Sequence, residues 1–191
     1  MTTHFWQGIS ASLLIGCLAS FGWAMSKFFL QPAGLTTGMK VVKGCGVAFG
    51  MVHFAAIIAT PGIAAVRGVS GAAFYLCAIG LFWWAIHTSL RQPLSAAFSP
   101  DLPAHLVAQG PYKIIRHPLY CSYLLCWLAG WVVTARLWLG PTVAVMLVIY
   151  VLAAAEEEKK FTRSPLAEAY RQYRARTGLF FPNPLKWHST G

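Results

Sequence analysis

Five long runs of apolar residues, separated by shorter polar stretches, constrain the fold of this chain more than any other feature. The runs cover residues 5–30, 41–66, 69–90, 119–133 and 137–155. A helix of about 20 apolar residues crosses the hydrocarbon core of a bilayer, and four of the runs are near that length or longer. The fourth is shorter, so we expect the chain at Pro118 and Leu119 to enter its helix at membrane depth. The pattern predicts an all-α, polytopic integral membrane protein with about five transmembrane helices.

The composition supports a membrane protein built as one compact unit. Hydrophobic residues make up 57% of the 191 residues and charged residues only 10%, whereas water-soluble domains carry about a quarter charged residues. We treat residues 1–191 as a single domain. Residues 1–90 are expected to form three N-terminal transmembrane helices. Residues 91–191 are expected to form a cofactor-binding, catalytic half, which ends in an amphipathic tail helix at residues 166–176 that lies on the bilayer surface.

The distribution of charge predicts the orientation in the membrane. The formal net charge is +10, with 15 Lys and Arg residues. If the C-terminus is cytoplasmic, all of these except Arg67 and Arg136 fall on the cytoplasmic side, as the positive-inside rule requires. We therefore expect the N-terminus outside and the C-terminus in the cytoplasm, in an inner or plasma membrane or an ER-type membrane. No nucleic-acid module accompanies the basic residues, so we expect no nucleic-acid partner and attribute the charge to topology and attraction to the bilayer surface.

The cysteines and the histidines of the apolar runs give no metal-ligand pattern. All five cysteines lie in or beside apolar runs, so we expect neither a disulfide framework nor a bound metal. His53 and His87 lie within or at the end of apolar runs. Two interpretations stay open for each of them, namely a hydrogen bond between helices or contact with a ligand.

The polar interval at residues 91–118 concentrates the residue types that the rest of the chain avoids. Residues 105–122 hold two histidines, two tyrosines, a Lys and an Arg. Gly110 and Pro111 predict a turn, and Pro118 disfavours helical geometry at the residue before it. Irregular backbone near a bilayer persists only where it is buried in protein or lines a wet cavity. The interval therefore predicts a binding site, and the preceding run and positive-inside bias place it on the cytoplasmic side.

Two blocks of residues in the second half of the chain form a recognisable pattern. The first block contains, in order, His105, Leu106, Val107, Gly110, Pro111, Tyr112, Arg116, His117, Pro118 and Tyr120. The second contains Glu156, Glu157, Glu158, Tyr170, Tyr173 and the run Thr177-Gly178-Leu179-Phe180-Phe181-Pro182. Together they resemble the signature of the isoprenylcysteine carboxyl methyltransferase family, which is related to the membrane phospholipid methyltransferases. The resemblance covers roughly residues 70–185, and the first two helices rest on hydropathy alone.

The resemblance implies S-adenosylmethionine as cofactor and assigns expected roles to particular residues. The expected cofactor-binding residues are His105, Leu106, Val107, Gly110, Tyr112, His117, Tyr120, Glu157 and Glu158. Arg116 and Glu157 are the expected catalytic residues, with Arg116 pairing with a carboxylate of the cofactor or of the acceptor. The expected substrate-binding residues are Tyr170, Tyr173 and Arg174. The resemblance implies an acidic pair without saying which two of the three glutamates form it; Phe161, four residues after Glu157, favours Glu157 with Glu158.

Three departures from the family pattern concern the acceptor side. Pro165-Leu166-Ala167 replaces a Phe-Gly before the tyrosine pair, and no basic residue precedes the acids. Ser122 and Leu179 also stand where the family commonly has Gly and Arg. These changes leave the acceptor open.

The sequence thus predicts a methyltransferase that uses a hydrophobic or lipid-like acceptor, most like one that methylates the carboxylate of isoprenylcysteine. Such a carboxylate is already nucleophilic at pH 7, so it needs no general base. The alternatives are a phospholipid-amine or thiol methyltransferase, an NADPH-dependent sterol-type membrane reductase, and a non-enzymatic lipid-binding membrane subunit.

Overall fold

The computed structural model describes residues 4–28, 36–90 and 102–183, and every structural statement below refers to this part of the chain. Its helices are α1 (Phe5–Trp23), which continues as a π-helical turn η1 (Ala24–Phe28), α2 (Thr37–Ile58), α3 (Ala65–Ser89), the 3-10 turn η2 (Gly110–Lys113), α4 (Pro118–Thr134), the 3-10 turn η3 (Leu137–Leu139), α5 (Gly140–Thr162) and α6 (Ala167–Arg176). No β-strand occurs among the described residues.

Four of the helical segments are long and apolar enough to cross a membrane. They are Phe5–Phe28, Thr37–Ile58, Ala65–Ser89 and Leu137–Thr162. The fifth apolar helix, α4, has only 17 residues, which at about 1.5 Å per residue is a few ångströms shorter than a hydrocarbon core of about 30 Å. The structure confirms an all-α, polytopic integral membrane protein.

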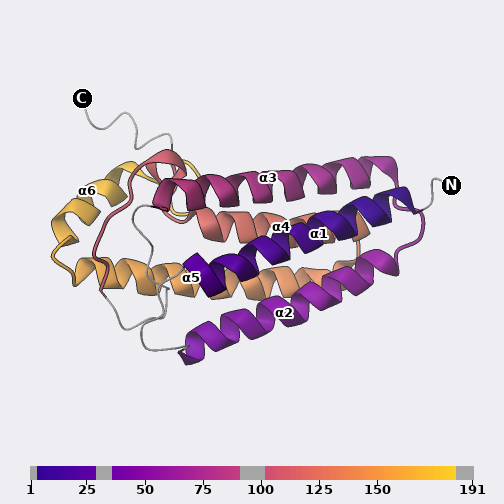
Figure 1. Ribbon diagram of the computed structural model, residues 1–191, viewed down its shortest axis with the longest axis horizontal. Helices are drawn as coiled ribbons and strands as arrows, with labels where there is room; N and C mark the ends of the chain where they lie inside the picture. Colours follow the sequence, from indigo (N-terminus) through magenta and orange to yellow (C-terminus); the bar gives the residue numbers. More distant parts are fainter. Residues whose placement is uncertain (1–3, 29–35, 91–101, 184–191) are drawn as a thin grey trace.

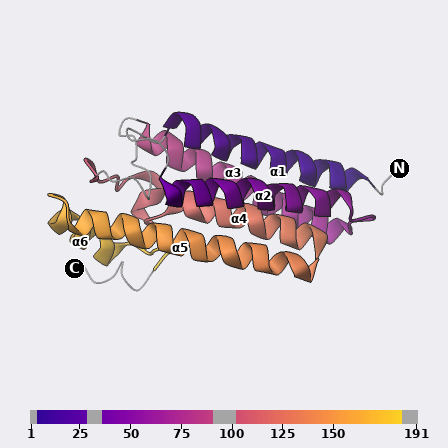
Figure 2. The ribbon, with the colours of Figure 1, turned by 90° about the horizontal axis from the view of Figure 1, so that it is seen from below.

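The five long helices run side by side along the long axis of the molecule (Figures 1 and 2). The most extensive helix contact joins α3 to α4, and α1 packs on α3. The N-terminus lies at one end of the bundle, and α6 lies at the other, together with the C-terminal ends of α3 and α5 (Figure 1). The turn η2 packs on α3 at the same end. The fold therefore brings the polar interval and the C-terminal acids to one end of the bundle.

The turn between α2 and α3 is not where the sequence predicted it. Arg67 and Gly68, the expected turn, lie inside α3. The chain reverses instead at Pro61 and Gly62, where Pro61 ends helical hydrogen bonding and Gly62 adopts a left-handed φ of 59°. Gly68 has a packing role, because a β-carbon there would lie 2.2 Å from the Trp6 ring.

The C-terminal part differs from the prediction in the length of α5. This helix does not end at Ala155 but runs to Thr162, so that the three glutamates lie in its last turns. Tyr170 of α6 is buried and its ring stacks on Phe161 of α5, with ring centroids 4.6 Å apart and planes 9° apart. Helix α6 therefore packs on α5 through Tyr170, and its place on the bilayer surface stays a prediction.

A buried polar contact ties together helices in the middle of the bundle. His53 Nε2 of α2 lies 2.8 Å from Thr142 Oγ1 of α5, and the His53 ring makes an edge contact with Trp127 of α4. The contact is close because Gly130 of α4 has no side chain: a β-carbon there would lie 2.3 Å from His53 Nδ1. Of the two interpretations of His53, the structure shows the hydrogen bond between helices.

Candidate active site

The irregular backbone of the polar interval is held by a return segment, which we define as residues 177–180. The N–H of Arg116 donates to the carbonyl of Gly178 at 2.8 Å, and the N–H of His117 donates to the carbonyl of Leu179 at 3.2 Å. In the opposite direction, the N–H of Gly178 donates to the carbonyl of Ile114 at 3.3 Å. Backbone that is not helical thus finds its hydrogen bonds in the protein, as a position near a bilayer requires.

We call the described part of the polar interval, residues 102–117, the loop. Arg116 joins the loop to α5 and to the end of α6. Its Nε donates to Oε1 of Glu158 at 2.7 Å, and its Nη1 donates to the carbonyl of Thr177 at 2.6 Å and more weakly to that of Arg174 at 3.5 Å. The Arg116 and Glu158 side chains are only 8% and 13% exposed. A charge-assisted pair this buried is short and geometrically specific. Arg116 is therefore directed inward, toward the protein.

His117 lies between the carboxylates of Glu157 and Glu158, which we call the acid pair. Its Nδ1 is 3.3 Å from Oε2 of Glu157. Its Nε2 is 3.5 Å from Oε1 of Glu158, within ion-pair reach but without a hydrogen bond. Burial alone would lower the pKa of His117, but the interaction of its ring with the two nearby carboxylates outweighs burial and raises that pKa above its ordinary value of 6.5. Although His117 occupies the N-cap position of α4, its side chain does not cap the helix.

Tyr120 completes the contact between the loop and the acid pair. Its hydroxyl donates to Oε1 of Glu157 at 2.5 Å. Its ring stacks on one side against His117, with centroids 5.6 Å apart, and on the other against Tyr150 of α5, with centroids 5.4 Å apart. This stack leaves little freedom for the imidazole and the phenol, so the groups that face the acid pair are positioned in advance.

The three glutamates have different surroundings. Glu157 and Glu158 face the loop, whereas Glu156 is half exposed and pairs with Lys159 on its own helix at 3.7 Å. The geometry therefore agrees with the interpretation that Glu157 and Glu158 form the acidic pair. Their role toward a cofactor stays a prediction.

The residues expected to bind substrate lie on α6, close to this cluster. Nε of Arg174 is 3.6 Å from Oε2 of Glu158. The hydroxyl of Tyr173 donates to the carbonyl of Tyr112 at 2.7 Å, which ties α6 to the loop, and Tyr170 is buried against α5. Burial raises the pKa of the Tyr112 hydroxyl, which lies 3.5 Å from a serine hydroxyl of α3.

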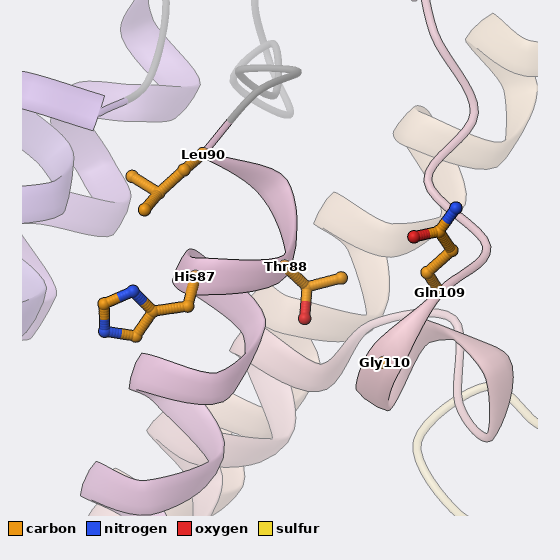
Figure 3. A pocket seen from close by; sticks show the side chains of 5 residues that line it. All are labelled: His87, Thr88, Leu90, Gln109 and Gly110. Carbon is orange, nitrogen blue, oxygen red and sulfur yellow. The ribbon is translucent and has the colours of Figure 1, made fainter.

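A polar hollow of about 530 Å³ lies where the end of α3 faces the loop (Figure 3). It is lined by His87, Thr88, Leu90, Gln109 and Gly110. Gly110 has a left-handed φ of 53°, and a β-carbon there would lie 2.3 Å from Thr88 Oγ1, so this approach of loop to helix requires glycine. The sequence singled out Gly110 and left His87 open, but it missed Thr88 and Gln109. The sequence could have indicated both by their positions: Thr88 follows His87 at the end of an apolar run, and Gln109 directly precedes the Gly-Pro turn.

The remaining predicted cofactor-binding residues precede this turn. His105 is exposed, Leu106 is half-buried, and Val107 is buried in the same apolar cluster as Tyr112. The structure thus brings His117, Tyr120 and the acid pair into direct contact. It places Gly110 at a separate hollow, and it shows His105 at the surface.

The cluster has the properties of a binding site for a cation. Two carboxylates lie close together, largely shielded from water, at the end of a membrane helix. Like charges this close require positive partners, which Arg116 and His117 supply in this structure. The described residues contain no group of three or more His, Cys, Asp or Glu side chains that could hold a metal ion.

Comparison with known proteins finds one family and two relatives. The profile of the phospholipid methyltransferase family matches residues 66–169. A cobalt-zinc-cadmium resistance protein, CzcN, of Cupriavidus metallidurans is 31% identical over 107 residues, which is 56% of this chain and 44% of that protein. A methanethiol S-methyltransferase of Pseudomonas deceptionensis is 33% identical over 73 residues, 38% of this chain and 26% of that protein. The matches thus span less than half the length of these relatives, and no solved structure matches.

Proposed function

This chain belongs to the phospholipid methyltransferase family, and we propose that it transfers the methyl group of S-adenosylmethionine to an apolar acceptor that reaches the site from the membrane. The matched residues include α3, α4, α5 and the start of α6. Membership in the family supports methyl transfer at a membrane. This activity, its donor and its acceptor are the proposal.

The observation that carries the proposal is the convergence of His117 and Tyr120 on the acid pair. S-adenosylmethionine bears an ammonium and a sulfonium group, and carboxylates in a water-poor site bind such cations strongly. The hollow at Gly110 is lined by the polar side chains of His87, Thr88 and Gln109 together with the apolar Leu90, a mixture that suits the ribose and adenine of the same molecule. The residues present therefore fit this cofactor. Glu157 and Glu158 would hold its cationic end, and Gln109 and Gly110 its nucleoside.

When bound, the cofactor supplies a methyl group on a positively charged sulfur. The chain contributes position and exclusion of water, since an in-line displacement needs little else when the acceptor is already nucleophilic. The aromatic stack of His117, Tyr120 and Tyr150 keeps the acid pair in place. Arg116 holds the loop against α5 and the return segment, so its contribution to the reaction is to fix the shape of the site.

Three acceptor classes are compatible with this site. The motif pattern favours the carboxylate of an isoprenylcysteine, which requires a cation for steering. Because Arg116 is directed inward, Arg174, whose side chain is 57% exposed beside Glu158, is the better candidate for that role. The relative that acts on methanethiol favours a thiol instead. A phospholipid amine, the class that the family's description names, is the third possibility.

The proposed orientation places the site in the cytoplasm, where the donor is made. Helix α4 begins at the site and is short for a full span. The acid pair would therefore lie just below the inner surface of the membrane, within reach of an acceptor dissolved in the bilayer.

Binding and product analysis on purified, detergent-solubilised protein test the proposal. We expect radiolabelled S-adenosylmethionine to bind the wild type and the Glu156→Ala control. We expect it to bind Glu157→Ala at least tenfold more weakly, because this variant lacks one of the carboxylates that would hold the cationic end of the donor. Methyl transfer into a total lipid extract, an isoprenylcysteine or a small thiol, followed by mass spectrometry, identifies the acceptor. Absence of binding to the wild type, or unchanged binding in Glu157→Ala, would refute the proposal. Binding of NADPH in its place would support the reductase.

A further inference from the structure

Each nitrogen of the His117 ring lies within ion-pair distance of a carboxylate, and this arrangement favours the protonated form of the ring. Nδ1 is 3.3 Å from Glu157 and Nε2 is 3.5 Å from Glu158. A neutral imidazole carries one N–H and one lone pair, so one of its nitrogens would direct a lone pair toward an anion. The imidazolium presents a positive N–H to each carboxylate. The geometry therefore favours a protonated His117, and the raised pKa agrees with it.

Several other charged or titratable groups surround this ring. On the Glu158 side these are Arg116, which donates to its Oε1, and Arg174, 3.6 Å from its Oε2. Tyr170 of α6 also lies beside Glu158; burial and then that carboxylate raise the pKa of its hydroxyl.

On the Glu157 side, the Tyr120 hydroxyl donates to the carboxylate and the Tyr120 ring stacks on the imidazole. Lys160 follows Glu157 by one helical turn along α5. Phe180 of the return segment covers another edge of the ring without charge. The acid pair is thus balanced by fixed guanidinium groups and by one cation, His117, that is able to lose its charge near neutral pH.

We infer that His117 gives up its proton when the methyl donor binds and regains it once the sulfonium charge of the donor is gone. This rests on the proposed function. The donor carries one more positive charge than S-adenosylhomocysteine, its demethylated product. In a buried site, adding a cation beside the acid pair disfavours the imidazolium, because like charges repel strongly where water is scarce. One N–H bond of the imidazolium breaks, its electron pair stays on the ring nitrogen, and the proton passes to the buffer.

The exchange makes His117 a residue that distinguishes the donor from its product. When His117 is neutral, the acid pair keeps a negative charge that the sulfonium of the donor can balance. With His117 protonated, the acid pair is already balanced, and the uncharged sulfur of the product gains nothing from it. The affinity for the donor should therefore weaken as the pH falls, by up to about tenfold per pH unit for a single linked proton. The affinity for the product should depend on pH much less.

Isothermal titration calorimetry on the purified, detergent-solubilised protein tests this inference with a readout other than activity. S-adenosylmethionine or S-adenosylhomocysteine is titrated at one pH into buffers of different ionisation enthalpy. The slope of the observed binding enthalpy against that ionisation enthalpy gives the number of protons released. We expect release with S-adenosylmethionine, less with S-adenosylhomocysteine, and none with either ligand in His117→Gln.

Two further variants keep the outcome interpretable. His4→Gln, at the opposite end of the bundle, should release protons as the wild type does. If His117→Gln does not fold, Glu157→Gln retains the histidine but removes one of its two carboxylates, and it should release fewer protons. Binding without proton release, or equal release in wild type and His117→Gln, overturns the inference and leaves the proposed function intact. A protein that binds neither ligand in any buffer refutes the proposed function itself.

Discussion

Replacing Gly178 by alanine should detach the return segment from the loop without unfolding the helical bundle. A β-carbon at this position would lie 1.7 Å from the carbonyl oxygen of Phe181 and 2.9 Å from its carbon. Both are backbone atoms, so no side-chain rotation relieves the overlap. Restoring even a 3.0 Å separation requires a displacement of about 1.3 Å, the difference between the two distances. The alanine is therefore incompatible with the observed backbone.

The size of the effect follows from the hydrogen bonds that such a displacement breaks. The carbonyls of Gly178 and Leu179 accept from the N–H groups of Arg116 and His117 at 2.8 and 3.2 Å, and the second distance is at the upper end of the usual range. Each backbone hydrogen bond is worth about 1 kcal/mol, and overpacking costs about 1–3 kcal/mol. We expect the closed arrangement to lose about 2 kcal/mol. Because only the closed arrangement has a complete site, cofactor affinity should fall by about tenfold to one-hundredfold.

Hydrogen–deuterium exchange and cofactor binding together measure this effect. The amides of Arg116 and His117 should exchange faster in Gly178→Ala, by roughly tenfold for each 1.4 kcal/mol lost, while amides of the transmembrane helices stay protected. Gly44→Ala is the matched control, since a β-carbon there meets nothing within 4 Å. Unchanged exchange at these two amides, with wild-type cofactor affinity, would show that the return segment does not hold the loop.

Three further predictions follow from the cluster and the bundle. Glu158→Gln leaves the largely buried Arg116 guanidinium without its anion and should lower the free energy of unfolding by about 3 kcal/mol. Glu156→Gln removes an exposed ion pair and should change that free energy by less than about 0.5 kcal/mol. Denaturant titrations of the two variants compare these effects. The folded-state pKa of His117 is raised, so its contribution to stability is complete below its unfolded pKa and is lost as the pH rises through the folded pKa. The melting temperature should thus fall above about pH 6.5 in the wild type and fall less in His117→Gln. Gly130→Ala would place a β-carbon 2.3 Å from His53 and should cost about 1–3 kcal/mol in thermal unfolding, and a melting temperature equal to that of the wild type would contradict the packing.

Much of the fold could be predicted because membrane helices leave a local signal. The apolar runs located all five long helices, since each must be apolar over most of its length to lie in lipid. The turn at Pro61 and Gly62 was missed because it lies within apolar sequence, where hydropathy alone shows no boundary. The end of α5 was missed for the opposite reason: hydropathy stops at Ala155, but the helix continues through charged residues to Thr162.

The candidate site was predictable in its residues but not in its contacts. The motif pattern selected His117, Tyr120 and the acid pair, and the structure brings these groups together. That Glu157 and Glu158 face the loop follows from the register of a helix whose extent was not evident from sequence. Two further contacts join positions that are far apart in the chain: the Tyr120 ring stacks on the Tyr150 ring, and Ile115 pairs with Gly178. No local sequence pattern predicts such long-range contacts.

The pairing of the loop with the return segment also sets an order of events during synthesis. The loop leaves the ribosome before α4 and α5, whereas its backbone partners at Gly178 and Leu179 are made only after both helices. The helices α3, α4 and α5 must therefore insert into the membrane before the loop between α3 and α4 has formed its hydrogen bonds with the return segment. A chain interrupted after α6 would be inserted and helical yet lack the backbone partners of Arg116 and His117, so its abundance in the membrane would not measure how much of it has the complete candidate site.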